Sequence, residues 1–337
     1  MTIDWGKRFA DLENERTKSV KGKVDTLINE YDESISTIER EIGAFFLRYA
    51  KKDKITYAEA KRMLTSSELK SFKFVLQKFI AQANDPKWKK VLEQLNARYR
   101  ISRLEMLLVI LQNEVERLAY LQEETVKSTA KEDYTEQYYH SLFLLQLGLG
   151  VGGKVEPVSE HTIEKLLKKD WAVDGLTFNE RIKSVSEKLK KELETTLIQG
   201  FTRNDHPQKI VDTIVKKFKI TRSNAERLVM TEHAYFCSSA TRDSFESLGV
   251  EKYEILATLD LRTSEICRSM DGKVFPLSEY RIGVTAHPFH PRCRTTEIPY
   301  FEDLKEGQRI ARDKYGKNIL VPRTMKYSEW HEKFVGK

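Results

Sequence analysis

The feature that most constrains the fold is a long apolar stripe near the amino terminus. Its members are separated alternately by three and four residues, which places them along one face of an α-helix. They are Val20, Val24, Leu27, Tyr31, Ile35, Ile38, Ile42, Phe45 and Tyr49. Charged residues fill most of the other positions. We therefore expect one helix from about Gly6 to Ala50 that packs against neighbouring helices.

Similar stripes continue through the first half of the chain. Thr65 and Glu68 form a capping-box pattern that predicts the start of a second helix. Asp85-Pro86 predicts the start of a third, since proline suits the first position of a helix. We expect this third helix to run from Trp88 nearly to Thr125, and a fourth from about Tyr134 to Leu147.

The glycines that follow Leu147 predict a hinge, so residues 1–150 are expected to form an elongated long-helix bundle. Residues 155–300 are expected to form a second, compact domain, and residues 301–337 a C-terminal helical tail. In the second domain we expect helices from Ser159, Thr177, Pro207 and Thr221, then a strand at 253–259. The tail predicts a polar helix over 302–314 and a last one that packs Trp330. The predicted class is α+β, predominantly α-helical, with a small β-sheet.

The charge balance gives little indication of a partner. The chain has 58 Lys and Arg against 51 Asp and Glu, a net charge of +7, and the two signs alternate as on solvated helix faces. We identify no concentrated basic patch, so any affinity for DNA is expected to be modest and salt-dependent. The amino terminus has no signal or transit pattern. The three cysteines indicate a reducing cytoplasm rather than a disulfide framework.

One short segment, Asp260 to Glu297, carries most of the candidate chemistry. Cys267, His290 and Cys293 have the spacing C-x22-H-x2-C. Thiolates and imidazoles are the ligands that structural zinc prefers, normally four in a tetrahedron. The sequence therefore predicts one structural zinc site, with Asp260 or His287 as the fourth ligand. The alternative is that the cysteines are small buried side chains and His290 a hydrogen-bonded turn residue.

Several charged residues near this segment suggest a structural ion-pair network. Arg227 and Glu232 precede the predicted strand, and Arg262 and Arg294 follow it. Charged groups buried at such positions are normally paired. A hydrolase that uses Glu232 and Asp260 as paired carboxylates is the enzymatic alternative. The chain contains no phosphate-binding loop, dinucleotide fingerprint, zinc-protease motif or serine-hydrolase elbow.

Taken in order, five short motifs resemble one known family. They are Trp171-x-x-x-Gly175 with Glu180-Arg181-Ile182, Arg222-x-x-Ala225-x-Arg227-Leu228-Val229-x-Thr231-Glu232, Asp260-x-Arg262-Thr263-x-x-x-Cys267, Asp271-Gly272-Lys273-Val274 and Pro288-x-His290-Pro291-x-Cys293-Arg294. This order is similar to the phage head morphogenesis family, the minor capsid proteins like phage Mu protein F and the portal-associated head protein of phage SPP1. The resemblance covers roughly residues 155–300.

The resemblance implies a virion protein of a tailed bacteriophage, attached to the portal vertex inside the capsid and present in the host cytoplasm during assembly. The implied partners are the portal protein, the major capsid or scaffold protein, and packaged double-stranded DNA bound without sequence preference. The implied roles are head assembly and DNA packaging or ejection, without enzymatic activity.

The chain departs from the family pattern at one position. The family often ends its last motif in Cys-Arg-Cys, whereas here Thr295 follows Arg294. The resemblance thus favours Cys267, His290 and Cys293 with Asp260 as ligands, and His287 as a substitute. Two other functions stay open. One is a metal- or carboxylate-dependent hydrolase or nuclease using Glu232, Asp260, His290 and Cys293. The other is a zinc-containing nucleic-acid-binding protein.

Overall fold

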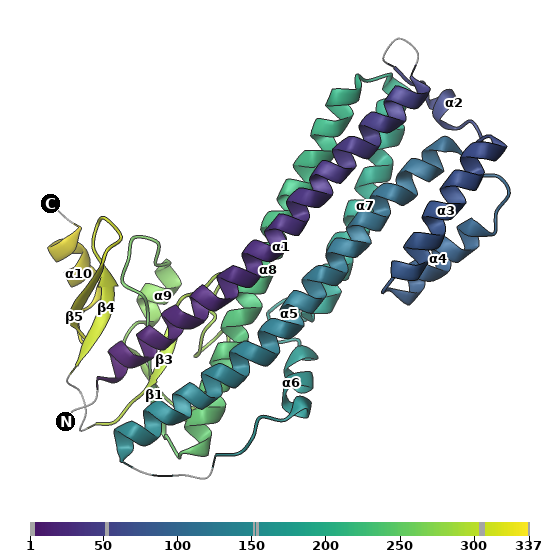
Figure 1. Ribbon diagram of the computed structural model, residues 1–337. Coiled ribbons are helices and arrows are strands. Elements are labelled where there is room, and N and C mark those ends of the chain that lie inside the picture. The colour runs from purple at the N-terminus through teal and green to yellow at the C-terminus, as the bar shows by residue number, and fades with distance from the viewer. Residues whose placement is uncertain (1–3, 51–53, 151, 153–154, 303–306, 336–337) are drawn as a thin grey trace. The chain divides into compact units, whose positions relative to one another are not determined.

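A computed structural model describes residues 4–50, 54–150, 152, 155–302 and 307–335. It confirms a predominantly helical α+β protein, with long helices and small antiparallel sheets (Figure 1). The chain forms two compact units. Unit 1 contains Met1–Val24, Val126–Phe178 and Arg227–Lys337, and unit 2 contains Asp25–Thr125 and Asn179–Glu226. Neither unit is contiguous in sequence, because long helices supply residues to both.

The regular elements in the described part of unit 2 are helices, with one isolated β-bridge between Met63 and Ser102. Unit 2 takes most of α1 (Trp5–Tyr49), all of α2 (Tyr57–Ala60), α3 (Ser66–Gln82) and α4 (Pro86–Asn96), and the first part of α5 (Arg103–Leu149). It also takes α7 (Phe178–Arg203) from Asn179 onward and the start of α8 (Pro207–Ser247). The single helix expected from the first apolar stripe is confirmed. Its stripe residues in this unit are buried, from Leu27 to Tyr49.

Polar contacts inside unit 2 connect its four long helices in a ring. Ser34 of α1 donates to Glu114 of α5 at 2.8 Å, and Lys190 of α7 pairs with Glu116 of α5. Lys217 of α8 lies 3.1 Å from Glu192 of α7, and Arg222 of α8 pairs with Asp32 of α1. Apolar side chains of all four helices fill the interior, as in a helix bundle.

The predicted third helix is wrong as one element, because the chain breaks between α4 and α5. Asp85 caps α4 as expected, accepting from Lys87 and Trp88. Ser102 then starts a new helix: its hydroxyl accepts from the Glu105 amide at 3.2 Å, and the Glu105 carboxylate accepts from the Ser102 amide at 2.7 Å. This reciprocal capping box satisfies free amide groups and fixes a helix start. The spacing of the leucines continues across the break between α4 and α5 and does not predict it.

Two predicted helix breaks do not exist. Helix α5 continues through residues 125–134 to Leu149, because Val126, Ala130 and Tyr134 extend its buried face. Helix α8 continues through Thr221, which the sequence suggested as a new helix start. The Thr221 hydroxyl donates to the Lys217 carbonyl at 3.0 Å, the four-residue back-bond of a threonine inside a helix. Thr221 is thus accommodated inside α8 and does not end the helix.

Unit 1 carries the described strands. Strand β1 (Lys252–Leu256) is the centre of an antiparallel sheet of order β2-β1-β3, between β2 (Val274–Pro276) and β3 (Thr296–Pro299). The register pairs Tyr253 with both Phe275 and Pro299. Short helices α6 (Glu160–Leu167) and α9 (Glu265–Met270) and a 3-10 turn (Leu277–Glu279) complete this part. The end of α8 is closed by Gly249 at φ +66°, as its position predicted.

The helix expected over residues 302–314 is wrong. Residues 308–312 form strand β4 (Gln308–Arg312), which pairs antiparallel with β5 (Asn318–Pro322). In this segment Arg309 and Ala311 alternate with more exposed neighbours, a period of two that suits a strand. A polar, solvent-exposed helix was predicted partly because Arg309 is charged, but the Arg309 side chain is buried. The final helix α10 (Tyr327–Phe334) buries Trp330 completely, as expected.

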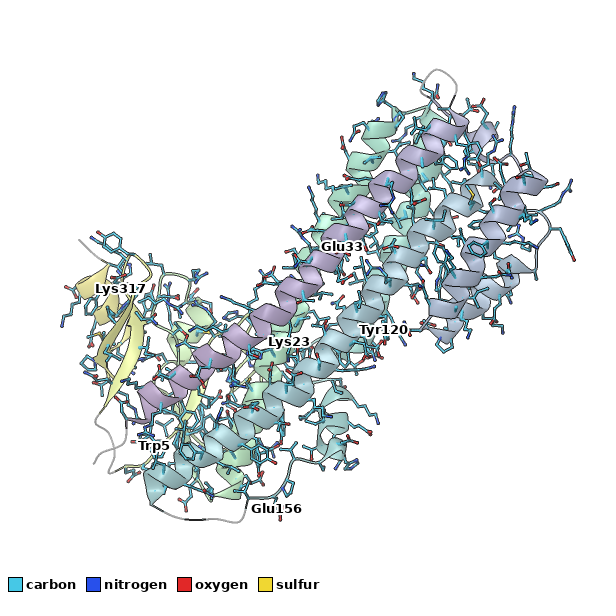
Figure 2. All side chains as sticks on the ribbon, viewed as in Figure 1. Trp5, Lys23, Glu33, Tyr120, Glu156 and Lys317 are labelled. Atoms are coloured by element: carbon cyan, nitrogen blue, oxygen red, sulfur yellow. The ribbon has the colours of Figure 1, made fainter. Side chains whose placement is uncertain are left out.

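The start of α1 packs into the core of unit 1 (Figure 2 labels Trp5). Trp5 is 1% exposed and joins Phe9, Leu145, Phe245 and Tyr253 in one apolar cluster. A Cβ atom at Gly148 would lie 1.9 Å from the Trp5 ring. Gly148 of α5 therefore allows α1 to pack closely against α5 at Trp5. The predicted hinge lies partly on residues 151, 153 and 154, which are outside the described range. No described helix is long and apolar enough to cross a membrane.

Candidate metal centre

Local backbone structure brings two distant cysteines together in unit 1. Ser264 caps α9 by accepting from the Cys267 amide at 3.3 Å, so Cys267 lies in the first turn of this short helix. The second segment is a tight turn in which the Cys293 amide donates to the His290 carbonyl at 3.2 Å. Arg292 adopts a left-handed conformation within it, at φ +60°. The turn directs His290 and Cys293 to the same side as Cys267.

The predicted residues Cys267, His290 and Cys293 form one compact group. Their ligand atoms all lie within 4.8 Å of one another, and among the described residues no other such group of potential metal ligands is found. The Cys267 sulfur is 3.2 Å from Nε2 of His290 and 3.6 Å from the Cys293 sulfur. Both cysteines are buried, and His290 is partly exposed. The third cysteine, Cys237, lies elsewhere in α8 beside His233.

The two thiols of this group are not equivalent. A hydrogen bond from Cys293 lowers the pKa of Cys267 to about 6, and Ser264, Thr295 and the Arg294 charge act in the same direction. The neighbouring Cys267 sulfur, together with burial, raises the pKa of Cys293 to about 12. At neutral pH and without a cation, the two thiols therefore share one proton, which stays on Cys293. A metal ion would favour loss of that proton as well, because metals bind cysteine as thiolate.

His290 is oriented as a ligand would be. Its Nδ1 lies 2.9 Å from the Pro291 carbonyl oxygen, which can only accept, so Nδ1 carries the proton. The other ring nitrogen, Nε2, lies 3.2 Å from the Cys267 sulfur, on the side of the cysteine group. A second contact that fixes the imidazole in this way is typical of metal-binding histidines.

Asp260 is held by arginines rather than by the cysteine group. Arg294 donates to both carboxylate oxygens, one bond measuring 2.8 Å, and Arg312 donates at 2.9 Å. The Arg262 backbone amide adds a bond of 2.9 Å. Burial disfavours the charged form, but these donors outweigh it and hold the pKa of Asp260 well below its usual range. To bind a metal, the carboxylate would have to leave these arginines.

His287 also has a different partner. Its Nδ1 lies 2.7 Å from Oε2 of Glu297, and its backbone amide donates to Oε1 at 2.8 Å. Burial opposes a charged imidazole, yet the Glu297 carboxylate raises the pKa of His287 to about 9. Tyr280 donates to the same carboxylate at 3.0 Å. His287 and Glu297, at 1% and 0% exposed, thus form a buried ion pair next to the candidate centre.

The remaining residues of the predicted ion-pair network do not meet as a set. Arg294 pairs with Asp260, whereas Arg227 and Arg262 are exposed and have no ion pair within the described part of the chain. Glu232 is buried and accepts from the Trp171 indole at 3.0 Å. The enzymatic alternative needs Glu232 and Asp260 to act together, but each is bound to a different partner. No observation favours this hydrolase.

Sequence reasoning missed two residues that organise this region. Arg312 is the second arginine on Asp260, and Arg309, 2% exposed, bonds the Asp271 carboxylate at 2.8 and 3.0 Å. Both lie on β4, where a helix was expected. The alternation of Arg309, Ala311 and their neighbours was the available signal. Asp271 also accepts from the Ala257 amide at 2.9 Å, so the predicted Asp271-Gly272 turn is fixed from both sides.

Comparison with known protein families gives a match in the second half of the chain. Residues 188–298 match the model of a family described as Phage Mu protein F like protein. The matched range includes most of α7, all of α8, the three-stranded sheet nearly to its end, and the Cys267, His290 and Cys293 group. No curated protein and no solved structure matches significantly. The match supports a phage head morphogenesis protein and confirms the resemblance expected from the motifs.

Proposed function

We propose that this protein is a minor capsid protein of a tailed bacteriophage that binds near the portal and contributes to head assembly and to DNA packaging or ejection. The observation that carries the proposal is the family match over residues 188–298, which contains the sheet and the cysteine group. The proposed partners are the portal protein, and the major capsid or scaffold protein.

Co-expression with the portal protein tests the first of these contacts. We expect the tagged portal protein of the same phage to retain this chain through affinity purification and gel filtration. An unrelated protein with the same tag serves as the control for non-specific association, and the tagged major capsid protein tests the second proposed partner. Retention by neither the portal nor the major capsid protein, with all components folded, would contradict the proposed place in the head.

We also propose that Cys267, His290 and Cys293 hold one structural zinc ion. Two thiols and one imidazole match the ligand preference of zinc, and the proton on Nδ1 leaves Nε2 of His290 free to bind. A bound zinc would cross-link α9 to the 290–293 turn. Asp260 and His287 stay predictions for the fourth ligand, and each would have to exchange its present partner for the metal.

Metal analysis of three cysteine variants tests the zinc proposal. Purified wild-type protein should contain about one zinc per chain, and Cys267→Ser and Cys293→Ser should lose it. Loss of a bound metal should lower the melting temperature by about 5–10 °C in these two variants. Cys237→Ser is the matched control, since Cys237 is also buried but lies outside the group. A metal-free wild-type protein with unchanged variants would refute the site.

The fourth ligand can be tested in the same assay. Because Asp260 is engaged by Arg294 and Arg312, Asp260→Asn should keep its zinc if the arginine contacts persist in the metal-bound protein. Loss of zinc in Asp260→Asn, with the fold intact, would instead identify Asp260 as a ligand.

A further inference from the structure

The charge excess of the chain is concentrated in one small part of unit 2. Residues 57–103, which include α2, α3 and α4, contain eleven Lys and Arg against four Asp and Glu. This local excess equals the net charge of +7 for all 337 residues, so the rest of the chain is balanced. The even mixture of charges expected from the whole sequence is therefore wrong for this segment. Averaging over the full length hid it.

These basic side chains are available to a partner. Lys70, Lys78, Lys87, Lys89 and Lys90 are exposed, and none of them forms an ion pair within the described ranges. One ion pair is found for the basic residues of α3, α4 and the loop that follows α4: Arg98 with Glu105 at 2.9 Å. Unneutralised charges of one sign on adjacent helices create a positive potential that attracts anions.

A small core fixes the positions of these charges. Phe72 and Leu76 of α3 pack with Trp88, Leu92 and Leu95 of α4, and Ile101 and Val109 complete the cluster. Figure 1 shows α3 and α4 as a pair of helices beside the start of α5. Because the apolar faces are used internally, the opposite faces present their lysines to solvent on a folded scaffold.

Two exposed aromatic rings lie among the lysines. Tyr99 is 86% exposed with Nζ of Lys73 at 5.1 Å from its ring centre. Phe74 is 60% exposed with Nζ of Lys78 at 4.7 Å. The Lys73 contact links α3 to the loop that follows α4, so both helices contribute exposed lysines to this part of unit 2.

We infer that this surface of α3 and α4, with Lys70, Lys73, Lys78, Lys87 and Lys90 as its main cations, binds the phosphate backbone of double-stranded DNA without sequence preference. Lysine is depleted in protein–protein interfaces, because its ammonium group is strongly hydrated and its long side chain loses entropy. In contrast, lysine contacts to phosphate provide most of non-specific DNA affinity. The choice of duplex DNA over another polyanion rests on the proposed function. The family match covers residues 188–298 and does not include this segment, so it gives no evidence for or against DNA binding there.

Fluorescence anisotropy with a labelled 30-base-pair duplex tests this inference on the full-length protein. The variant replaces Lys70, Lys78, Lys87 and Lys90 with Gln. A matched control replaces four exposed lysines of α7 and α8 with Gln, which gives the same change in net charge: Lys183, Lys188, Lys191 and Lys216. Circular dichroism melting verifies that both variants fold.

The wild-type protein should bind the duplex with an affinity that falls steeply with salt. The α3–α4 variant should bind at least about tenfold more weakly at 100 mM salt, and its log–log salt slope should fall by about 3, near 0.9 per lost phosphate contact. The control should stay within about threefold of wild type. Equal losses of duplex affinity in both variants would show that overall charge, rather than the α3–α4 surface, determines binding, and would overturn the inference. Absence of duplex binding by the wild-type protein would also overturn it.

The proposed function is judged by different results. If DNA binding fails while the protein still enters virions, the inference is wrong and the head-protein assignment stands. If the protein binds DNA through this surface but is absent from virions, the assignment fails instead. An acidic protein as the true ligand would appear as weak duplex binding that is unaffected by the α3–α4 substitutions.

Discussion

Asp260 illustrates how a charged residue acquires a role that its sequence position leaves open. It was expected beside a metal, and it does lie in the predicted region, but two arginines occupy its oxygens. One of them, Arg312, comes from a strand 52 residues later in the sequence. Spacing within a short motif predicted that Cys267, His290 and Cys293 lie close together. It carries no information about partners that only the tertiary fold delivers.

Substitution Asp260→Asn should destabilise the protein at neutral pH by about 3 kcal/mol, because Arg294 would be left without its carboxylate. A carboxyl group with a lowered folded-state pKa stabilises the fold above its unfolded pKa, and this contribution is lost as pH falls through the folded-state value. The difference between wild type and variant should thus be constant above about pH 5 and shrink below 3.8.

Urea unfolding between pH 3 and pH 7 measures this difference. Glu246→Gln is a suitable control, since Glu246 is 66% exposed in its ion pair with Arg242 and should change stability by no more than about 0.5 kcal/mol. A difference for Asp260→Asn that is the same at pH 3 and pH 7 would show that its charge is not stabilising the fold.

The buried pair of His287 and Glu297 predicts the opposite pH dependence. The folded-state pKa of His287 is raised from 6.5 to about 9, so its contribution is complete below pH 6.5 and is lost as pH rises through 9. The stability difference between wild type and His287→Gln should fall by about 3 kcal/mol over this interval. Cys267 titrates in both proteins, and taking the difference removes its effect. A difference independent of pH from 6 to 9.5 would contradict the charged pair.

At the scale of elements, side-chain periodicity predicted the helices and missed where they break. The stripe from Val20 to Tyr49 became one buried helix face, as expected. The break before α5 depends on the hydrogen bonds of Ser102 and Glu105, which an apolar pattern does not contain. Strand β4 was missed because Arg309 is polar in sequence and buried in the fold, where Asp271 neutralises it. Both errors come from polar side chains satisfied by specific partners.

Helix packing at Gly148 gives a prediction about α1 and α5 within unit 1. Gly148→Ala should destabilise the protein by about 1–3 kcal/mol, because the added methyl group overlaps the buried Trp5 ring. Gly43→Ala provides the control, since nothing lies within 4 Å of its added Cβ. That substitution should stabilise α1 by up to about 1 kcal/mol, the helix preference for alanine. Thermal melting of both variants measures the contrast, and stabilisation by Gly148→Ala would contradict the packing.

At the scale of the whole molecule, the sequence predicted the class of fold and the proximity of Cys267, His290 and Cys293, whereas the metal itself stays a proposal. Linear domains were expected, whereas each compact unit gathers separate segments of the long helices α1, α5 and α8. The division depends on which parts of these helices pack together, and a pattern that repeats uniformly along a helix does not specify it. The basic α3–α4 surface was hidden for a similar reason, because whole-chain charge averages over all segments.

The central proposal is that this protein is a minor component of a phage head, and it rests on the family match over residues 188–298. The most direct test is quantitative mass spectrometry of phage particles that encode this chain, purified by density-gradient banding. We expect peptides from across the whole sequence in intact particles, far fewer than those of the major capsid protein. Their absence from infectious, DNA-filled particles and from assembling heads would contradict the proposal.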